Sequence, residues 1–132
     1  MKITEARAAL IAYITGLDLT ITGVFDEPPR HDPFPFVRVG DAIATPDDLL
    51  VERGSQQVIE VHVFTREPQR DQVNLLVGQL HQALHRATFD VEGCQNVQAL
   101  VEQVNVFEDA GDPAKTRQWH GIVRVRVILF NV

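Results

Sequence analysis

The stretch QVIEVHVFT, residues 57–65, carries the clearest secondary-structure pattern in the chain and decides which class of fold the sequence can form. Its residues fall into two alternating sets: Val58, Glu60, His62 and Phe64, and Ile59, Val61, Val63 and Thr65. Side chains alternate between the two faces of a strand, and a face of β-branched residues is typical of one that packs on a core. The stretch therefore predicts a strand that is buried on the face of Ile59 and solvated on the face of Glu60.

Two more strands are expected toward the C-terminal end, over residues 96–107 and 119–132. The last one reads WHGIVRVRVILFNV, where a set of valines and one leucine alternates with a set that includes Arg124 and Arg126. This alternation predicts a strand with one apolar face and one mixed face.

Four prolines between Pro28 and Pro35 precede a short alternating run, residues 36–39. Proline fits neither a helix interior nor a central strand, and it biases the residue before it toward extended geometry. We therefore expect a stiff, extended approach to a strand at residues 36–39. The β-branched residues of 20–25 predict another short strand.

Two helices are expected, over residues 4–17 and 71–87, because apolar residues recur there at spacings of three and four. In the first helix, Thr4 is the expected N-cap and Gly16 the expected end. The apolar stripe of the second helix consists of Val73, Leu76, Val77, Leu80, Leu84 and Ala87. This stripe predicts that the second helix packs on the core.

Residues 41–56 show no clean period and predict a long loop or a hairpin excursion, with Asp47 and Asp48 beside Leu49 at its middle. Long loops inside small domains are uncommon and usually functional. The order of the elements and their short connections predict one α+β domain over residues 1–132. Its expected architecture is an antiparallel sheet of four or five strands, two helices packed on one face, and a long loop after the second strand.

Composition narrows the possible functions. The 132 residues carry a formal net charge of −6, and no basic run is present, so specific nucleic-acid binding is not expected. The lone cysteine, Cys94, cannot form a disulfide within the chain. No apolar run reaches the length of a membrane span, and Glu5 and Arg7 interrupt the position of a signal peptide. We expect a soluble protein made in the cytoplasm.

No catalytic, cofactor or metal site is evident in the sequence. His81 and His85 have metal-ligand spacing, but Gln82 breaks the zinc-protease pattern, and the favoured interpretation is a pair of surface histidines. The glycines have neither phosphate-loop nor dinucleotide spacing, and the single serine, Ser55, is not in a nucleophile elbow. Trp119 and His120 are compatible with a pocket, although packing at a strand end is favoured.

Several short motifs recur in a fixed order along the chain. A proline-aromatic strand entry (residues 33–37) is followed by Gly40 and a long loop, and later by the alternating strand of residues 58–64. The second helix ends in Ala-Leu-His (83–85), and the last strand opens on Trp-His-Gly (119–121). In this order and spacing the chain resembles, over nearly its whole length, the phage tail completion proteins, also called tail terminator or tail-to-head joining proteins. These occur in long-tailed phages, prophages and gene transfer agents.

This resemblance implies a structural role in the virion, without catalysis or cofactor. Such proteins form a ring, typically a hexamer, that caps the tail tube, ends its growth and faces the head connector. The implied partners are therefore further copies of the chain, the tail tube protein and head connector or adaptor proteins, with no membrane. The loop after Gly40 is expected to place acidic residues against basic ones of a neighbouring subunit. The residues expected at a subunit or tail interface are Phe36, Arg38, Asp47, Asp48, Leu49, Arg53, Arg117, Trp119, His120, Arg124 and Arg126.

Two alternatives stay open at this point. One is a different neck or head-completion protein, which the sequence separates poorly from a tail terminator. The other is a small-molecule-binding regulatory domain, because two helices on an antiparallel sheet form a common architecture that does not specify function.

Overall fold

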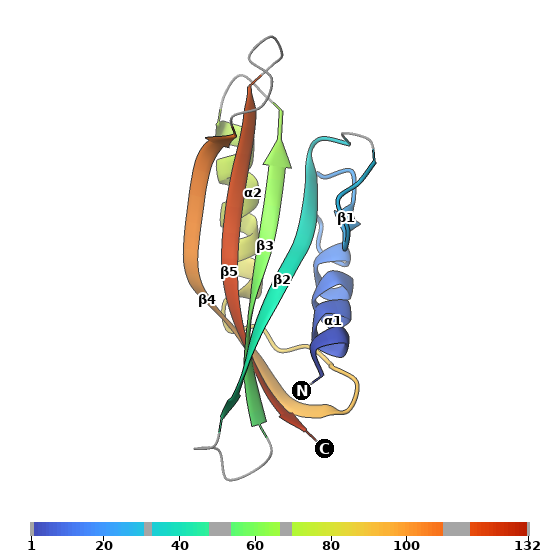
Figure 1. Ribbon diagram of the computed structural model, residues 1–132. Coiled ribbons are helices and arrows are strands. Elements are labelled where there is room, and N and C mark those ends of the chain that lie inside the picture. Colours follow the sequence, from blue (N-terminus) through green and yellow to red (C-terminus); the bar gives the residue numbers. More distant parts are fainter. Residues whose placement is uncertain (1, 31–32, 48–53, 67–69, 110–116, 132) are drawn as a thin grey trace.

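The computed structural model describes residues 2–30, 33–47, 54–66, 70–109 and 117–131, and it forms two layers, a sheet and a pair of helices (Figure 1). The elements in chain order are α1 (Ile3–Thr15), β1 (Val24–Phe25), β2 (Phe36–Asp47), β3 (Gly54–Thr65), α2 (Asp71–Leu84), β4 (Cys94–Asp109) and β5 (Gln118–Asn131). The five strands are ordered β1-β2-β3-β5-β4. β1 is parallel to β2, and every other neighbouring pair is antiparallel. The predicted α+β fold class is confirmed.

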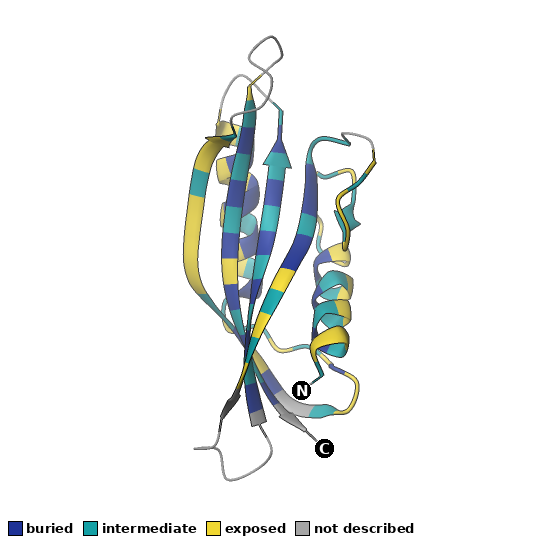
Figure 2. Cartoon of the chain, in the orientation of Figure 1, coloured by how far each residue is buried: buried dark blue, intermediate teal, exposed yellow. Residues whose placement is uncertain are grey.

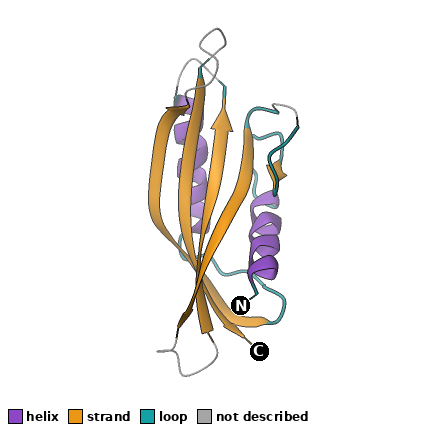
Figure 3. Cartoon of the chain, in the orientation of Figure 1, coloured by secondary structure: helices purple, strands orange, loops and turns teal. Residues whose placement is uncertain are grey.

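Both helices contribute to one core on one side of the sheet (Figure 3). α2 packs against β5, β4 and β3, whereas α1 packs against β2 and β1. Figure 2 shows the result as alternating buried and partly exposed bands along the central strands. No helix in the described part of the chain is both long and apolar enough to cross a membrane.

The predicted face of the strand that decides the fold is confirmed. Ile59, Val61, Val63 and Thr65 are all fully buried. The stripe of α2 is confirmed for Val73, Leu76, Val77, Leu80 and Leu84, which are buried. The helix ends at Leu84, so the predicted end at Ala87 is wrong. The odd-numbered residues of β5 from Val123 to Leu129 complete this layer.

Of the two alternatives predicted for residues 41–56, the hairpin excursion is confirmed, and the long loop is wrong at both of its ends. β2 continues to Asp47 and β3 begins at Gly54, and the two strands pair as far as Asp47 and Gly54. The cause is a β-bulge: the register shifts between Val39 and Ala42, so the alternation of side chains is broken at that point. Residues 48–53 lie outside the described part of the chain.

Smaller differences concern element ends and the proline segment. α1 begins at Ile3, and its N-cap is Lys2 without a side-chain hydrogen bond, so the predicted cap at Thr4 is wrong. Gly16 ends this helix as predicted. Of the strand expected over residues 20–25, only Val24–Phe25 forms. Bends at residues 34–35 replace the straight approach expected before β2, and the Phe34–Pro35 peptide bond is cis.

The bulge in β2 also fixes the position of α1. Arg7, on α1, donates from Nε to the carbonyl oxygen of Gly40 at 3.0 Å and from Nη2 to that of Val39 at 2.8 Å. The same guanidinium forms an ion pair with Asp26, just after β1. One arginine therefore ties the first helix, the first strand and the bulged strand together.

A second close contact joins α2 to β5 at Gly121. A Cβ atom added there would lie 2.5 Å from Cγ2 of Val77 and 3.2 Å from Cγ2 of Val73. Valine side chains are stiff at χ1, so neither can swing away cheaply. The missing side chain at Gly121 thus sets how closely the helix approaches the sheet.

Leu80→Ala is expected to lower the free energy of unfolding by about 2–5 kcal/mol, because Leu80 is fully buried on α2 and the truncation leaves a cavity. Chemical denaturation monitored by circular dichroism measures the change. Leu75→Ala is the matched control, since Leu75 lies on the same helix and is 61% exposed. Equal losses in the two variants would contradict the orientation of α2.

Gly121→Ala is expected to cost about 1–3 kcal/mol of stability, because the new methyl group overpacks the contact with Val77. The control is Gly78→Ala on α2, where an added Cβ meets nothing within 4 Å. That change is expected to be neutral or to stabilise the protein by up to about 1 kcal/mol through helix propensity. Melting temperatures that fall equally in both variants would show that Gly121 has no special packing role.

Candidate functional site

The sheet has one face that the helices leave uncovered, and we call it the outer face. It carries Phe36, Arg38, Glu60, His62, Phe64, Gln103, Asn105, Phe107, His120, Ile122, Arg124 and Arg126, which the strand register places on one side of the sheet. Five of the residues predicted at an interface lie here: Phe36, Arg38, His120, Arg124 and Arg126. Strand alternation was sufficient to group them.

Four aromatic rings cross the outer face in a single row. Phe36 pairs with Phe64, Phe64 with His120, and His120 with Phe107, so the row runs from β2 to β4. Successive ring centroids lie 4.8, 4.3 and 4.8 Å apart. Ring pairs at these distances stabilise the fold by more than the burial of their surface area alone. The row is therefore a rigid apolar band on an otherwise polar face, and it ends at Phe107, which is 38% exposed.

A pair of histidines lies at the centre of this band. Nδ1 of His62 and Nε2 of His120 are 2.8 Å apart, a hydrogen bond in which one ring donates and the other accepts. The ring of His62 also rests on the bulge, because a Cβ at Gly40 would lie 2.8 Å from Nε2 of His62. Gly40 thus leaves room for the imidazole, and the bulge indirectly holds His62 against its partner.

The surroundings of both histidines favour the neutral rings. Burial, followed by the neighbouring His62, lowers the pKa of His120 to about 4, against the opposing effect of Asp109 and Glu60. Burial is also the main reason that the pKa of His62 is lowered, and Arg38 acts in the same direction while Glu60 and Asp41 oppose it. At neutral pH the pair is therefore an uncharged, hydrogen-bonded unit.

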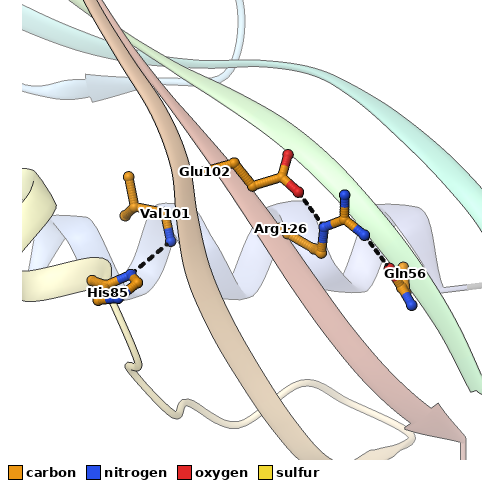
Figure 4. Close-up of polar contacts among 5 residues, drawn as sticks. All are labelled: Gln56, His85, Val101, Glu102 and Arg126. Atoms are coloured by element: carbon orange, nitrogen blue, oxygen red, sulfur yellow. Dashed lines mark hydrogen bonds and ion pairs between the residues drawn. The ribbon is translucent and has the colours of Figure 1, made fainter.

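Charged side chains next to the band are mostly paired within the chain. Arg124 lies 3.5 Å from Glu60 across β5 and β3. Arg126 donates to both Glu102 and Gln56, so that one guanidinium joins three strands (Figure 4). Glu60, Gln103, Asn105, Ile122 and Arg124 line a polar depression of about 120 Å³ beside these pairs.

Arg38 differs from the other two arginines of the outer face. The described residues offer its buried Nε no hydrogen-bond partner, and no ion pair to it is found among them. A guanidinium on an aromatic surface that forms no ion pair with the described residues is a candidate to bind a carboxylate of another molecule. Arg38 is accordingly the strongest single candidate for an intermolecular contact.

The remaining predicted interface residues lie elsewhere. Trp119 projects from the opposite face, is only 3% exposed, and has the guanidinium of Arg70 over its ring at 4.6 Å. Its neighbour in sequence, His120, reaches the outer face because adjacent strand residues point to opposite sides. Arg117 is 64% exposed and lies 3.6 Å from Glu108. Asp47 ends β2, and Asp48, Leu49 and Arg53 lie outside the described residues.

His62 and Phe107 are contributors that the predicted interface residues did not include. Both lay within predicted strands, and His62 was assigned to the correct face, but their contacts with His120 depend on strand order and register. The alternation of residues along a strand predicts neither the strand order nor the register. The bulged residue Glu102 was also not anticipated.

The two helical histidines have a structural role. The backbone N–H of Val101 donates to Nδ1 of His85 at 3.1 Å (Figure 4). The rings of His81 and His85 are stacked with centroids 5.5 Å apart. No group of three or more potential metal-ligating side chains occurs within the described ranges. Burial raises the pKa of the Cys94 thiol, which disfavours the reactive thiolate.

Acidification is expected to destabilise the fold through the histidine pair. Because the folded-state pKa of His120 lies below its unfolded value near 6.5, the unfolded chain binds more protons between about pH 6.5 and 4. The stabilisation is complete above pH 6.5 and is lost as the pH falls toward 4, by roughly 1–2 kcal/mol after allowance for partial exposure. Urea titrations at pH 7.5, 6 and 5 measure this loss.

His120→Phe is the variant that tests this effect, because it keeps a ring in the row and removes the titrating group. The variant is expected to show a flatter dependence of stability on pH between 6.5 and 5. His81→Phe, an exposed position of α2, serves as control and should keep the wild-type profile. An unchanged profile in His120→Phe would assign the acid sensitivity to other groups.

Comparison with known proteins agrees with this arrangement. The sequence profile of the family described as "Tail completion protein gp17" matches residues 5–129. No match is found among curated proteins. A chain in the solved structure described as "Virion of native gene transfer agent (GTA) particle" has a similar fold, with a TM-score of 0.77, 16% sequence identity, and coverage of 96% of this chain and 97% of that one. The profile spans nearly the whole sequence, and the chain therefore belongs to the tail completion protein gp17 family, a family of structural proteins of phage tails.

Proposed function

We propose that the chain assembles into a homo-oligomeric ring, with six copies as the expected number, that caps the tail tube. In this role it ends tube growth and joins the tail to the head connector. Its location is the tail-neck region of the virion, and before assembly it resides in the host cytoplasm. The proposal includes no catalytic activity, cofactor, membrane or specific nucleic-acid binding.

The observation that carries this proposal is the combination of the aromatic row with Arg38. Interfaces are enriched in aromatic residues and arginine relative to the remaining surface. On the outer face four rings form one band, and the guanidinium beside it has no internal ion pair among the described residues. Family membership supplies the class of partner, a component of a phage tail.

Ring closure places a further requirement on the surface. Contacts around a ring are heterologous, so that one patch of each copy meets a different patch of the next copy. With a net charge of −6, two copies repel each other unless acidic and basic groups face one another. We propose that the segment with Asp47, Asp48, Leu49 and Arg53 supplies the second patch, with its carboxylates directed to arginines such as Arg38 and Arg117 of the neighbour.

The first test is negative-stain electron microscopy of the purified protein, alone and mixed with tail tubes. Rings, or a cap at one end of each tube, are the expected result. Particles that bind only portal or adaptor proteins would indicate a head-side neck role instead. A ligand-dependent rise in melting temperature without any binding to tubes would favour a small-molecule-binding domain.

Arg38→Glu is expected to weaken ring formation or tube capping at least tenfold. The variant replaces the guanidinium with a carboxylate, which repels the carboxylates of the acidic segment of the neighbouring copy. The melting temperature should change by no more than a few degrees. Arg86→Glu is the control, since it makes the same charge change at an exposed position next to the C-terminal end of α2. Tube capping and melting that match the wild-type values in Arg38→Glu would place the interface elsewhere.

A further inference from the structure

β4 is an edge strand, and the described residues cover only part of its free edge. Around the middle of the strand, Ala99 exchanges backbone hydrogen bonds of 2.8 Å with the segment of Arg86 and Ala87. Val101 donates its N–H to the ring of His85. Beyond Val101, the described residues make no such contact with this edge. Figure 1 shows β4 as the outermost strand there, and Figure 2 shows it as the longest exposed strand segment.

The register shows which backbone groups of this open segment point outward. Ala99 and Val101 direct their amides away from β5, and outward residues alternate along an antiparallel edge. A bulge between Val101 and Gln103 inserts one residue and resets the alternation. By this alternation, the backbone groups of Val104, Val106 and Glu108 point outward, whereas those of Gln103, Asn105 and Phe107 point toward β5. The outward residues therefore present a row of donors and acceptors with no partner among the described residues.

The opposite edge of the sheet is protected in a different way. β1 pairs with the start of β2, and the guanidinium of Arg7 binds the next two carbonyl groups of that strand, those of Val39 and Gly40. Natural sheets commonly shield or charge their edges, since an open edge is a template for another strand. Residues 37–40 of β2 are thus covered by β1 and Arg7, whereas the described residues leave β4 open from Val104 to Glu108.

The side chains of this segment combine apolar anchors with negative charge. Val104 is 41% exposed on the helix side of the sheet and Phe107 is 38% exposed on the outer face, so both sides offer apolar contact. β4 carries Glu102, Glu108 and Asp109 and contains no lysine or arginine. Arg126 pairs with Glu102 and Arg117 lies 3.6 Å from Glu108, whereas Asp109 has no ion pair among the described residues.

This charge selects the kind of strand that can be added. Two copies of β4 paired edge to edge would bring like charges together, which is destabilising across strands. The far part of β2, residues 41–47, also contains aspartates and no basic residue, so this edge of a second copy is no better partner. We propose that the β4 edge from Val104 to Glu108 binds an extended, basic segment of a different protein, which adds to the sheet as a further strand and continues the aromatic row beyond Phe107.

Hydrogen exchange of the free protein, followed by NMR, tests whether the edge is open. The amides of Val104, Val106 and Glu108 are expected to exchange at least tenfold faster than those of Gln103, Asn105 and Phe107. Uniform protection along the segment would mean that the chain covers its own edge, and the proposal would then be wrong.

Binding is tested with a synthetic ten-residue peptide that alternates lysine with valine or threonine, and with a matched peptide that has glutamate in place of lysine. The lysine peptide is expected to slow exchange at Val104, Val106 and Glu108 at least tenfold at saturation, with an effect that weakens in high salt. Equal effects of both peptides, or none, overturn the proposal.

Val106→Pro removes one outward N–H while the bonds to β5 remain, and proline is tolerated at a strand edge whose N–H faces solvent. It should abolish peptide binding, whereas Val106→Thr, which keeps the N–H, should bind as the wild type does. The wild-type comparison of the two peptides decides the question even if the proline variant does not fold. Concentration-dependent self-association that Val106→Pro removes would identify a second copy as the occupant and contradict the proposal. Ring formation is scored separately by microscopy, so either idea can fail alone.

Discussion

The bulge at Gly40 and Asp41 is the constraint on which the arrangement of this domain depends. It lets β2 continue along β3 while two of its residues oppose one. The same irregularity presents two carbonyl groups to Arg7, which anchors α1, and leaves space for the ring of His62 on the other face. The contact with α1 on the core side and the position of His62 on the outer face therefore both depend on Gly40. Any side chain larger than hydrogen at Gly40 would collide with the imidazole of His62.

The outer face and the β4 edge are two exposed surfaces that differ in their charges and in their hydrogen bonding. On the outer face, Arg124 and Arg126 are paired with carboxylates of the same chain, aromatic rings are stacked in a row, and Arg38 has no ion pair among the described residues. At the edge, β4 carries carboxylates and no basic residue, and the described residues leave part of its backbone groups unpaired. The first kind of surface suits repeated contact with identical neighbours, whereas the second discriminates among strands by their charge.

Much of the fold was predictable because alternation is intact in β3 and β5, and helical spacing is intact in α2. Prediction from the sequence failed where a bulge adds one residue to a strand. At Gly40 the bulge concealed the second half of β2, and at Glu102 another bulge concealed which valines of β4 face outward. The outer-face position of Arg38, Arg124 and Arg126 followed from alternation. The histidine pair and the aromatic row did not, because contacts between strands depend on register and sheet order. Trp119 was grouped with His120 on the basis of adjacency, which in a strand separates side chains.

The buried position of Trp119 has a practical consequence for optical measurements. The chain contains a single tryptophan, and its indole lies under Arg70 on the helix side of the sheet. Intrinsic fluorescence excited at the tryptophan band thus originates from the layer between α2 and β5 and from nowhere else. A spectral change on assembly would therefore report rearrangement beneath the sheet, while a contact confined to the outer face would leave the emission nearly unaltered. The protein carries its own internal probe for distinguishing rigid docking from repacking.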